Sequence, residues 1–279
     1  MTEAQAVSWQ EPVGVLADLL TSSRVRAGAL EQGAGKLFRQ AEMMAAPPSF
    51  AGALRSSVVS LVCEIKRSSP SKGVIAADLD LSSRVRAYEA GGASALSILT
   101  EPRRFGGSLA DLQLAGETVG LPLLRKDFIV SELQLAEARV HGASAALLIA
   151  RALPPARLIQ LAHAAADLGL DALVEVRDER ELSSALESGA PVIGVNTRNL
   201  ETLEIDPAVA HLLIPQIPAD RIAVYESGIS TREDVESAAA TGADAVLVGS
   251  SLSASRDAEG AVRGLAGVSV GSVRRRAST

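Results

Sequence analysis

The sequence predicts an α/β protein built as a single closed (β/α)8 barrel with an N-terminal helical extension. Three observations carry this prediction. The chain has 279 residues, close to the roughly 250 typical of one such barrel. Apolar runs recur along it with amphipathic stretches between them. No G-x-G-x-x-G follows any run, as an open dinucleotide-binding sheet would require.

A repeat in the apolar runs sets the number of strands. Gly92, Gly142, Gly189 and Gly242 each end a helical pattern and precede a buried run, 47 to 53 residues apart. That spacing is about twice the length of one βα unit, so a further strand should lie between each pair. Eight strands result, near residues 58–66, 94–99, 121–126, 145–150, 171–176, 192–196, 221–226 and 244–248. Such apolar strands alternating with helices indicate a parallel sheet covered by helices.

The ends of the chain lie outside this repeat. We expect an N-terminal helical extension over residues 1–57, with helices at 15–20 and 27–44, that ends at Pro47-Pro48 and caps the barrel or overlies its mouth. The catalytic barrel should span 58–267. Residues 268–279, with three consecutive arginines at 274–276, should form a frayed tail.

Composition and charge narrow the range of possible functions. Hydrophobic residues make up 47% and aromatic residues 3%, so the core must consist of Ala, Leu, Val and Ile. The net charge of -6 argues against nucleic acid or an anionic membrane as partner and leaves a small anionic ligand possible. The single cysteine, Cys63, and three scattered histidines indicate no disulfide framework and no metal site. Without a signal peptide or a membrane-length apolar run, the protein is expected to be cytoplasmic, and we expect a monomer.

Ionisable and polar residues gather where the predicted strands end, which in a parallel barrel is one mouth. Glu64 and Lys66 share a face at the end of the first strand because strand side chains alternate, which leaves Cys63 facing the helices as a small buried hydrophobe. The other strand ends supply Lys126, Glu175, Asn196, Arg198, Glu226 and Ser227. Burying so many polar groups without function would cost several kcal/mol, so we expect an active site there.

Two loops have the composition of a phosphate cradle. Ser227-Gly228 and Gly249-Ser250 follow the last two strands, where barrels often bind phosphate through backbone N–H groups. A side chain at Gly249 is expected to project toward the phosphate oxygens. The loop after the first strand contains S-x-x-K at residues 69–72, but the S-D-N and K-T-G motifs of penicillin-recognising enzymes are absent. We therefore expect that loop to face a phosphate or carboxylate.

These residues resemble the indole-3-glycerol phosphate synthase family over about residues 58–255. The matching segments are EIKRSSPSKG (64–73), YEAGGA (88–93), LTE (99–101), FGGS (105–108), LRKDF (124–128), LVEV (173–176), GVNTRNL (194–200), ESGI (226–229) and VGS (248–250). The segments at 64–73 and 124–128 are together highly specific for this family. Tyr225 replaces a small residue, Ser251 replaces a glutamate, the helix after Phe128 lacks aromatic residues, and the N-terminal extension matches only loosely. None of these departures removes a residue expected to act in the chemistry.

The resemblance implies the closure of the indole ring of 1-(2-carboxyphenylamino)-1-deoxyribulose 5-phosphate with loss of CO2 and water, a step of tryptophan biosynthesis. Lys126 would protonate the carbonyl and Glu175 would accept and return a proton. Lys66, paired with Glu64, would hold the substrate carboxylate or act as a second acid. The remaining expected roles are orientation by Asn196 and Arg198, substrate contacts from Ser69, Phe128, Glu226 and Ser227, and phosphate binding by Ser227, Gly228, Gly249 and Ser250. The resemblance implies no metal and no organic cofactor.

Three other functions remain open on the sequence. An isomerase or epimerase of another sugar phosphate could use the same phosphate end, although two lysines and two acids exceed the single acid–base pair that most such enzymes need. A Schiff-base aldolase could use Lys126 or Lys66 as nucleophile. A catalytically silent barrel that binds a partner would have little reason to keep this charged set.

Overall fold

Eight parallel strands form a closed ring in the computed structural model, which describes residues 9–70, 73–76 and 79–271. Their order around the ring follows the chain, and β1 closes it by pairing with both β4 and β10. The strands are β1 (Ser60–Ile65), β4 (Ala95–Leu99), β5 (Leu123–Lys126), β6 (Ala145–Ile149), β7 (Asp171–Val176), β8 (Val192–Asn196), β9 (Ile222–Glu226) and β10 (Ala245–Val248). The prediction of a (β/α)8 barrel with these eight strands is confirmed.

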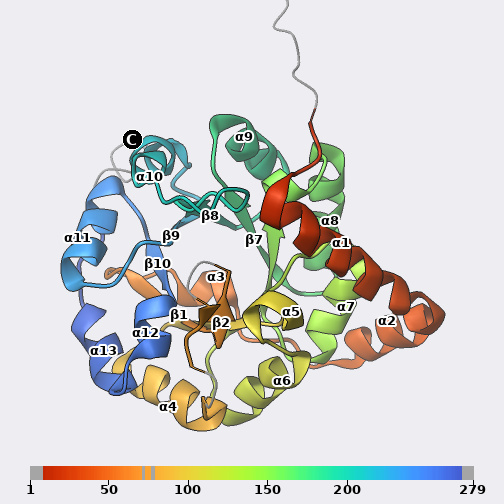
Figure 1. The fold of residues 1–279 in the computed structure, drawn as a ribbon, viewed down its shortest axis with the longest axis horizontal. Helices are drawn as coiled ribbons and strands as arrows, with labels where there is room; N and C mark the ends of the chain where they lie inside the picture. The colour runs from red at the N-terminus through yellow and green to blue at the C-terminus, as the bar shows by residue number, and fades with distance from the viewer. Residues whose placement is uncertain (1–8, 71–72, 77–78, 272–279) are drawn as a thin grey trace, which may run out of the picture.

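Helices surround the ring (Figure 1). The outer helices are α4 (Leu81–Gly91), α6 (Leu109–Thr118), α7 (Glu132–Val140), α8 (Pro155–Asp167), α9 (Glu179–Glu187), α10 (Ala208–Leu213), α11 (Arg232–Thr241) and α13 (Ala258–Leu265). Two short helices, α5 (Pro102–Phe105) and α12 (Ser250–Ala254), follow β4 and β10 directly. A small hairpin of β2 (Ser68–Ser69) and β3 (Gly73–Val74) follows β1.

Two of the repeat glycines show why the sequence folds into these units. Gly92 and Gly242 are the C-caps of α4 and α11, with φ angles of 99° and 98°. A left-handed residue is a common way to end a helix, and glycine adopts it without steric penalty. Each glycine therefore stops its helix and turns the chain into the next strand.

The core contains few aromatic side chains, as predicted. Buried Leu, Val, Ile and Ala residues fill the space between the strands and the helices. Cys63 belongs to this layer: its side chain is fully buried, and burial raises the pKa of its thiol well above the usual range. The predicted alternation along β1 is confirmed, because Cys63 packs in the core while Glu64 lines the mouth.

In the N-terminal extension, the first helix is longer than predicted and the second is broken. Helix α1 (Gly14–Ala29) extends well beyond the expected 15–20, and a 3-10 turn (Glu31–Gly33) separates it from α2 (Ala34–Met43). The expected continuous helix over 27–44 is therefore wrong, consistent with the low helix propensity of Gly28, Gly33 and Gly35. The extension ends in α3 (Phe50–Ala53).

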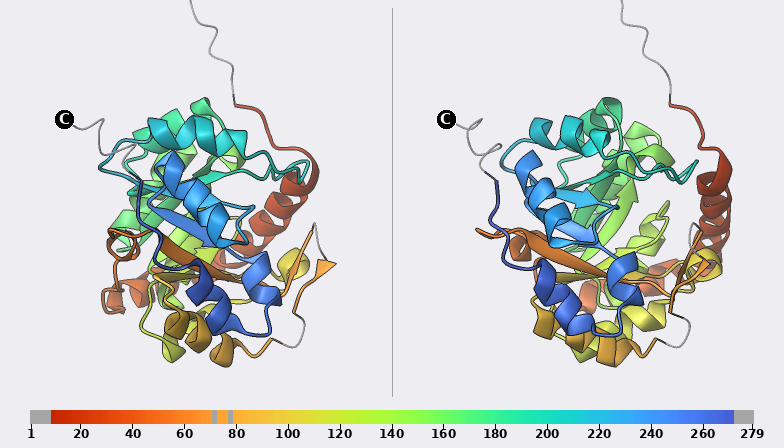
Figure 2. Two further views of the ribbon diagram at one scale, coloured as in Figure 1. Left: turned by 90° about the vertical axis from the view of Figure 1, so that its left-hand side faces the viewer. Right: turned by 60° about the vertical axis from the view of Figure 1, so that its left-hand side comes forward.

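The extension reaches both ends of the barrel. Val15 and Leu19 of α1 line the cavity in the mouth. The backbone N–H of Ala51 in α3 donates to Asp171 at the start of β7, which lies at the opposite end. In Figure 2, α1 and the β2–β3 hairpin lie at one end of the barrel and the last described residues lie at the other.

The predicted frayed tail is wrong for its first residues. Val58 forms a β-bridge with Ser269, and the N–H groups of Val59 and Val270 donate to Val268 and Ser57. Residues 268–270 are thus paired to the segment that leads into β1. The arginines at 274–276 lie outside the described residues.

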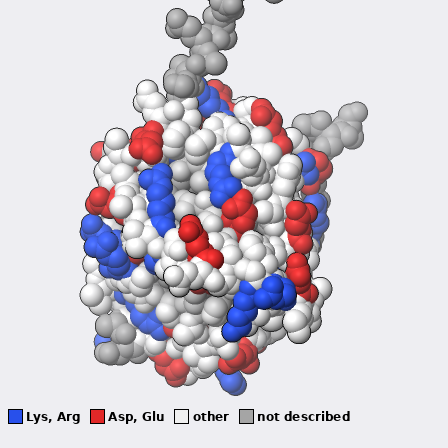
Figure 3. Space-filling view, turned by 90° about the vertical axis from the view of Figure 1, so that its right-hand side faces the viewer, with Lys and Arg blue, Asp and Glu red and all other residues white. Residues whose placement is uncertain are grey.

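Charges of both signs are interspersed on the face that carries α1, α2 and α7 (Figure 3). No continuous basic surface, of the kind that binds nucleic acid, lies on that face. Among the described residues, no helix combines the length and apolarity needed to cross a bilayer.

Candidate active site

A cavity of about 310 Å³ lies in the mouth of the barrel, at the carboxyl ends of the strands. The structure brings all of the predicted site residues to its wall: Glu64, Lys66, Ser69, Lys126, Phe128, Glu175, Asn196, Arg198, Glu226, Ser227, Gly228, Gly249 and Ser250. They come from five of the eight barrel strands, from the loops that follow these strands and from the start of the segment after β10. Ser71 and Lys72 of the loop after β1 lie outside the described residues.

Lys126 lies at the centre of the charged groups. Its Nζ is 2.5 Å from Glu226 Oε2 and 3.5 Å from Glu175 Oε2. Burial by itself lowers the pKa of Lys126, but the attraction of Glu226, Glu175 and Glu64 outweighs it and raises the pKa well above the usual value. Lys126 is therefore a firmly protonated cation at neutral pH, placed to donate a hydrogen bond or a proton.

Glu226 is the most buried carboxylate of this cluster. Burial raises the pKa of Glu226 to about 7, against the opposing attraction of Lys126. Its Oε1 has no hydrogen-bond partner among the described residues, and a Cβ at Gly194 would lie only 2.0 Å from that oxygen. Glycine at position 194 thus makes the space in which Glu226 contacts Lys126.

A second ion pair forms on β1, between Lys66 Nζ and Glu64 Oε1 at 2.6 Å. It lies directly beside Gly249, because a Cβ built there would be 2.3 Å from Glu64 Oε1 and 3.1 Å from Lys66 Nζ. The expectation that a side chain at Gly249 projects toward the phosphate stays a prediction. Such a side chain would first collide with the Glu64–Lys66 pair.

The end of β8 forms a hydrogen-bonded turn with the end of β9. Asn196 Oδ1 accepts from the backbone N–H of Arg198 at 2.9 Å and from Ser227 Oγ at 2.8 Å. The guanidinium of Arg198 donates to the carbonyl of Leu203, and burial lowers its pKa. Ser227 has a φ of 70°, a region that a side chain rarely adopts. Such strain is typical of functional positions.

The loops after β9 and β10 line one end of the cavity. Gly228 has a φ of 82°, and Ser250 begins α12 directly after Gly249. Unpaired backbone N–H groups at such loop and helix starts favour anions. Ser251 also lines the cavity, and its hydroxyl donates to the carbonyl of Ile229. Tyr225 is buried in the core, where burial raises its pKa.

An apolar wall faces these polar groups, and of its residues only Phe128 was expected from the sequence. Phe105 and Phe128 both line the cavity, with ring centroids 6.1 Å apart. Glu101 caps α5 by accepting from the backbone N–H groups of its first residues, which fixes Phe105. Val15 and Leu19 of α1 complete the wall. Phe105 could have been found because it belongs to the FGGS segment, whereas nothing local marks Val15 and Leu19.

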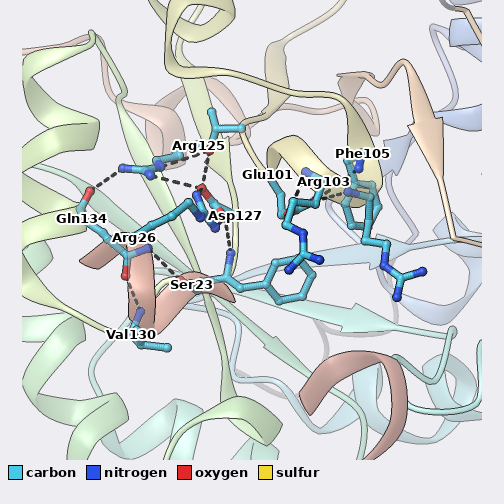
Figure 4. A network of polar contacts seen from close by, with 12 residues as sticks. Ser23, Arg26, Glu101, Arg103, Phe105, Arg125, Asp127, Val130 and Gln134 are labelled. Carbon is cyan, nitrogen blue, oxygen red and sulfur yellow. Dashed lines mark hydrogen bonds and ion pairs between the residues drawn. The ribbon is translucent and has the colours of Figure 1, made fainter. Parts of the chain in front are cut away.

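A buried network fixes α1 to the strand that carries Lys126 (Figure 4). Arg26 of α1 forms two hydrogen bonds, of 2.8 and 2.7 Å, with the carboxylate of Asp127. Arg125 donates to the same carboxylate and to the carbonyl of Gln134, whose side chain in turn donates to Ser23 of α1. Asp127 is the residue after Lys126, so this network fixes the strand end from which Lys126 projects.

The polar side chains do not form a metal centre. No group of three or more His, Cys, Asp or Glu among the described residues is arranged to hold a metal ion. Of the residues that the structure describes, the cations that line the main cavity are Lys66, Lys126 and Arg198. The fold and the site therefore define a (β/α)8-barrel enzyme with an acid–base cluster, an aromatic wall and loops suited to phosphate.

Comparisons with known proteins narrow that class. The family model of indole-3-glycerol phosphate synthase matches residues 20–265. Indole-3-glycerol phosphate synthase 1 of Streptomyces coelicolor is 52% identical, with 76% of this chain and 79% of the relative covered. The indole-3-glycerol phosphate synthase of Parafrankia sp. is 46% identical, with 85% and 86% covered. Among solved structures, 3-hexulose-6-phosphate synthase from Salmonella typhimurium has a TM-score of 0.60 at 15% identity, over 78% of this chain and 99% of that one, a likeness of fold alone.

The chain belongs to the indole-3-glycerol phosphate synthase family. Its activity is that of a carboxy-lyase of tryptophan biosynthesis, as the resemblance in the sequence implied.

Proposed function

We propose that Lys126 and Glu175 act as acid and base on 1-(2-carboxyphenylamino)-1-deoxyribulose 5-phosphate in the mouth of the barrel. The observation that carries this proposal is the 3.5 Å contact between Lys126 Nζ and Glu175 Oε2 inside a buried cavity. An acid and a base held together away from bulk water suit a reaction that both adds and removes protons. The aromatic wall on one side and the glycine-rich loops on another match the two ends of the substrate.

The cavity suggests one orientation for the substrate. The aryl ring packs against Phe105 and Phe128, and the phosphate lies at the loops after β9 and β10. Lys66 is the cation beside Gly249, so we assign it to the phosphate end rather than to the substrate carboxylate. That leaves Arg198, which Asn196 holds through its backbone N–H, to face the carboxylate.

The first chemical step forms the new carbon–carbon bond. Lys126 gives a proton to the carbonyl oxygen while the ring carbon that bears the carboxylate attacks the carbonyl carbon. The bond to the carboxylate then breaks, CO2 leaves, and the electron pair restores the aromatic ring. Glu226 and Glu175 keep Lys126 in place as a cation for this step.

The second step removes water. Glu175 takes a proton from the carbon between the nitrogen and the hydroxyl-bearing carbon, and the hydroxyl leaves with a second proton as water. Glu175 can thus accept the proton from carbon and return it to the leaving hydroxyl within the same cavity. The product is the indole.

The charge state of Lys126 argues against the Schiff-base alternative. A Schiff-base lysine must be neutral to attack a carbonyl, and such lysines have lowered pKa values. Three carboxylates raise the pKa of Lys126 instead, although burial opposes them. The structure thus favours a proton donor over a nucleophile.

Cellular location, oligomeric state and domain division stay predictions. We propose a cytoplasmic monomer, because α1 of the same chain completes the wall of the cavity and no second subunit is needed for it. We keep the division into an extension at 1–57, a barrel at 58–267 and a tail at 268–279, with residues 268–270 paired to the start of the barrel.

Replacement of Glu175 by glutamine tests the assignment of the base. The amide keeps the shape and the hydrogen bonding but cannot accept a proton, so kcat should fall about 10²–10⁴-fold with little change in KM. Steady-state assays of the substrate named above, with indole fluorescence as readout, provide both constants. An unchanged kcat with a raised KM would instead make Glu175 a binding residue.

A further inference from the structure

A second cavity, of about 170 Å³, lies behind the catalytic base. Glu175, Asn196 and Arg198 line both this cavity and the main one, so they form the wall between them. The other side of the second cavity is formed by the loop after β7 and the start of α9, and it includes Glu181 and the exposed Asp178. Glu175 therefore faces the substrate on one side and a route toward the surface on the other.

Glu181 is held in this cavity by the backbone around it. Its Oε2 accepts from the N–H of Arg177 at 2.7 Å, and its own N–H donates to Asp178, the N-cap of α9. The carboxyl group of Glu181 is thus fixed to the backbone of Arg177, which is two residues after Glu175 along the chain. A simple structural reading is that Glu181 only stabilises this loop.

The charges around Glu181 give it a further property. Burial, together with the charges of Asp178 and Glu175, raises the pKa of Glu181 to about 7, against the Arg177 N–H and the attraction of Arg151. Arg198, Arg177 and the Arg151–Glu201 ion pair also line the cavity. A carboxyl with such a pKa can both hold and release a proton at neutral pH.

The reaction itself requires a proton from solvent in every turnover. The substrate carboxylate leaves as neutral CO2 and the carbonyl oxygen leaves as water, so that oxygen gains two protons. Only one is recovered from the substrate, when the base takes it from carbon. One proton is therefore consumed each cycle, and in the mechanism above it comes from Lys126.

We propose that Glu181 passes this proton from solvent, through the second cavity and Glu175, to Lys126. Glu175 Oε2 is 3.5 Å from Lys126 Nζ, so a shift of a few tenths of an ångström brings the two atoms to hydrogen-bond distance for the last transfer. The transfer is downhill, because the pKa of Lys126 is far above that of an ordinary carboxyl. This proposal rests on the roles of Lys126 and Glu175 proposed above.

Glu181→Gln tests it, with Glu187→Gln on the exposed face of the same helix as matched control. Glutamine can still accept from the Arg177 N–H but cannot carry a proton. With enzyme in excess, the first turnover of Glu181→Gln should proceed at the wild-type rate, because Lys126 is already protonated. At saturating substrate and low buffer concentration, kcat should fall about tenfold or more, most strongly at alkaline pH, with KM unchanged.

Added imidazole, a small proton donor, should restore kcat of Glu181→Gln, and Glu181→Asp should keep most of the activity. Glu187→Gln should match the wild type throughout. The proposal is overturned if Glu181→Gln keeps the wild-type kcat, or if it slows the first turnover and later turnovers equally without rescue, as a purely structural role predicts. If Glu181→Gln does not fold, Glu181→Asp is measured instead. A loss of kcat relative to the wild type that depends on pH supports the proton route, and the absence of such a loss overturns it.

Failure of the underlying mechanism has a different signature. If Glu175→Gln leaves the first turnover unchanged, Glu175 is not the base, whatever Glu181 does. If the wild type and Glu175→Gln behave as proposed while Glu181→Gln behaves like Glu187→Gln, only the proton route fails.

Discussion

At Lys126, one ammonium group faces three carboxylates, and the balance of their charges decides what the residue can do. Its contact with Glu226 is a charge-assisted hydrogen bond of 2.5 Å, and Glu175 remains at 3.5 Å, free to act on substrate. Burial raises the pKa of Glu226 against the attraction of Lys126, and its short contact places it to hold Lys126 in position. The roles of the three residues thus follow from their distances.

Gly249 provides a prediction at the same scale. Gly249→Ala should lower kcat about tenfold or more, because its Cβ would lie 2.3 Å from Glu64 Oε1 and displace the Glu64–Lys66 pair. Steady-state kinetics with the phosphorylated substrate measures this effect. Gly264→Ala on α13, where a Cβ meets nothing within 4 Å, is the control and should match the wild type. Unchanged kcat and KM in Gly249→Ala would show that Glu64 and Lys66 tolerate displacement.

Helix α1 is the element that most changes how the site is understood. It places Val15 and Leu19 in the wall of the cavity and sends Arg26 to Asp127, next to Lys126. It is therefore a part of the active site that comes from outside the barrel.

Arg26→Met should weaken the attachment of α1. Loss of two charge-assisted hydrogen bonds should lower the free energy of unfolding by about 1–3 kcal/mol, and KM should rise because the apolar wall loosens. Urea unfolding and steady-state kinetics measure the two effects. Arg24→Met is the control, since the ion pair that Arg24 forms within the described part of the chain is an exposed one with Glu11, at 3.6 Å, and the change in stability should be less than about 0.5 kcal/mol. Equal behaviour of the two variants would show that Arg26 does not hold α1.

The contrast between strands and extension shows what the sequence can predict. The eight strands were predictable because each is a buried run before a polar end, and the glycines at 92 and 242 mark the helix ends. The polar side chains of the mouth followed from strand alternation. The break in the extension is marked locally by glycines, which apolar periodicity does not weigh. The pairing of Val58 with Ser269 depends on a contact distant in sequence, for which periodicity gives no signal. Periodicity likewise gives no signal for the contact between Arg26 and Asp127, which are 101 residues apart.

At the scale of the whole molecule, buried charge couples stability to pH. Burial alone would raise the pKa of Asp127, but Arg26, Arg125 and Thr100 lower it far below the usual 3.8. A carboxyl with a depressed pKa in the folded state stabilises the fold above its unfolded pKa, and that stabilisation is lost as pH falls toward the folded value.

Asp127→Asn should therefore be destabilised at neutral pH, by about 3 kcal/mol or more, because it removes the carboxylate that pairs with Arg26 and one of the two carboxylates that Arg125 contacts. The difference from the wild type should shrink as pH falls below the 3.8 of an unperturbed carboxyl. Urea unfolding at about pH 7 and about pH 3 measures both differences. A difference that stays constant over this range would show that Asp127 does not carry the proposed charge coupling.

The proton donor is the group on which the whole mechanism depends, and Lys126→Ala measures its contribution. The wild-type protein should convert 1-(2-carboxyphenylamino)-1-deoxyribulose 5-phosphate to a product with indole fluorescence. Lys126→Ala should keep the wild-type circular dichroism spectrum and lose about 10²–10⁴-fold in kcat. Near-normal turnover of folded Lys126→Ala at saturating substrate would contradict the assignment of Lys126 as the acid.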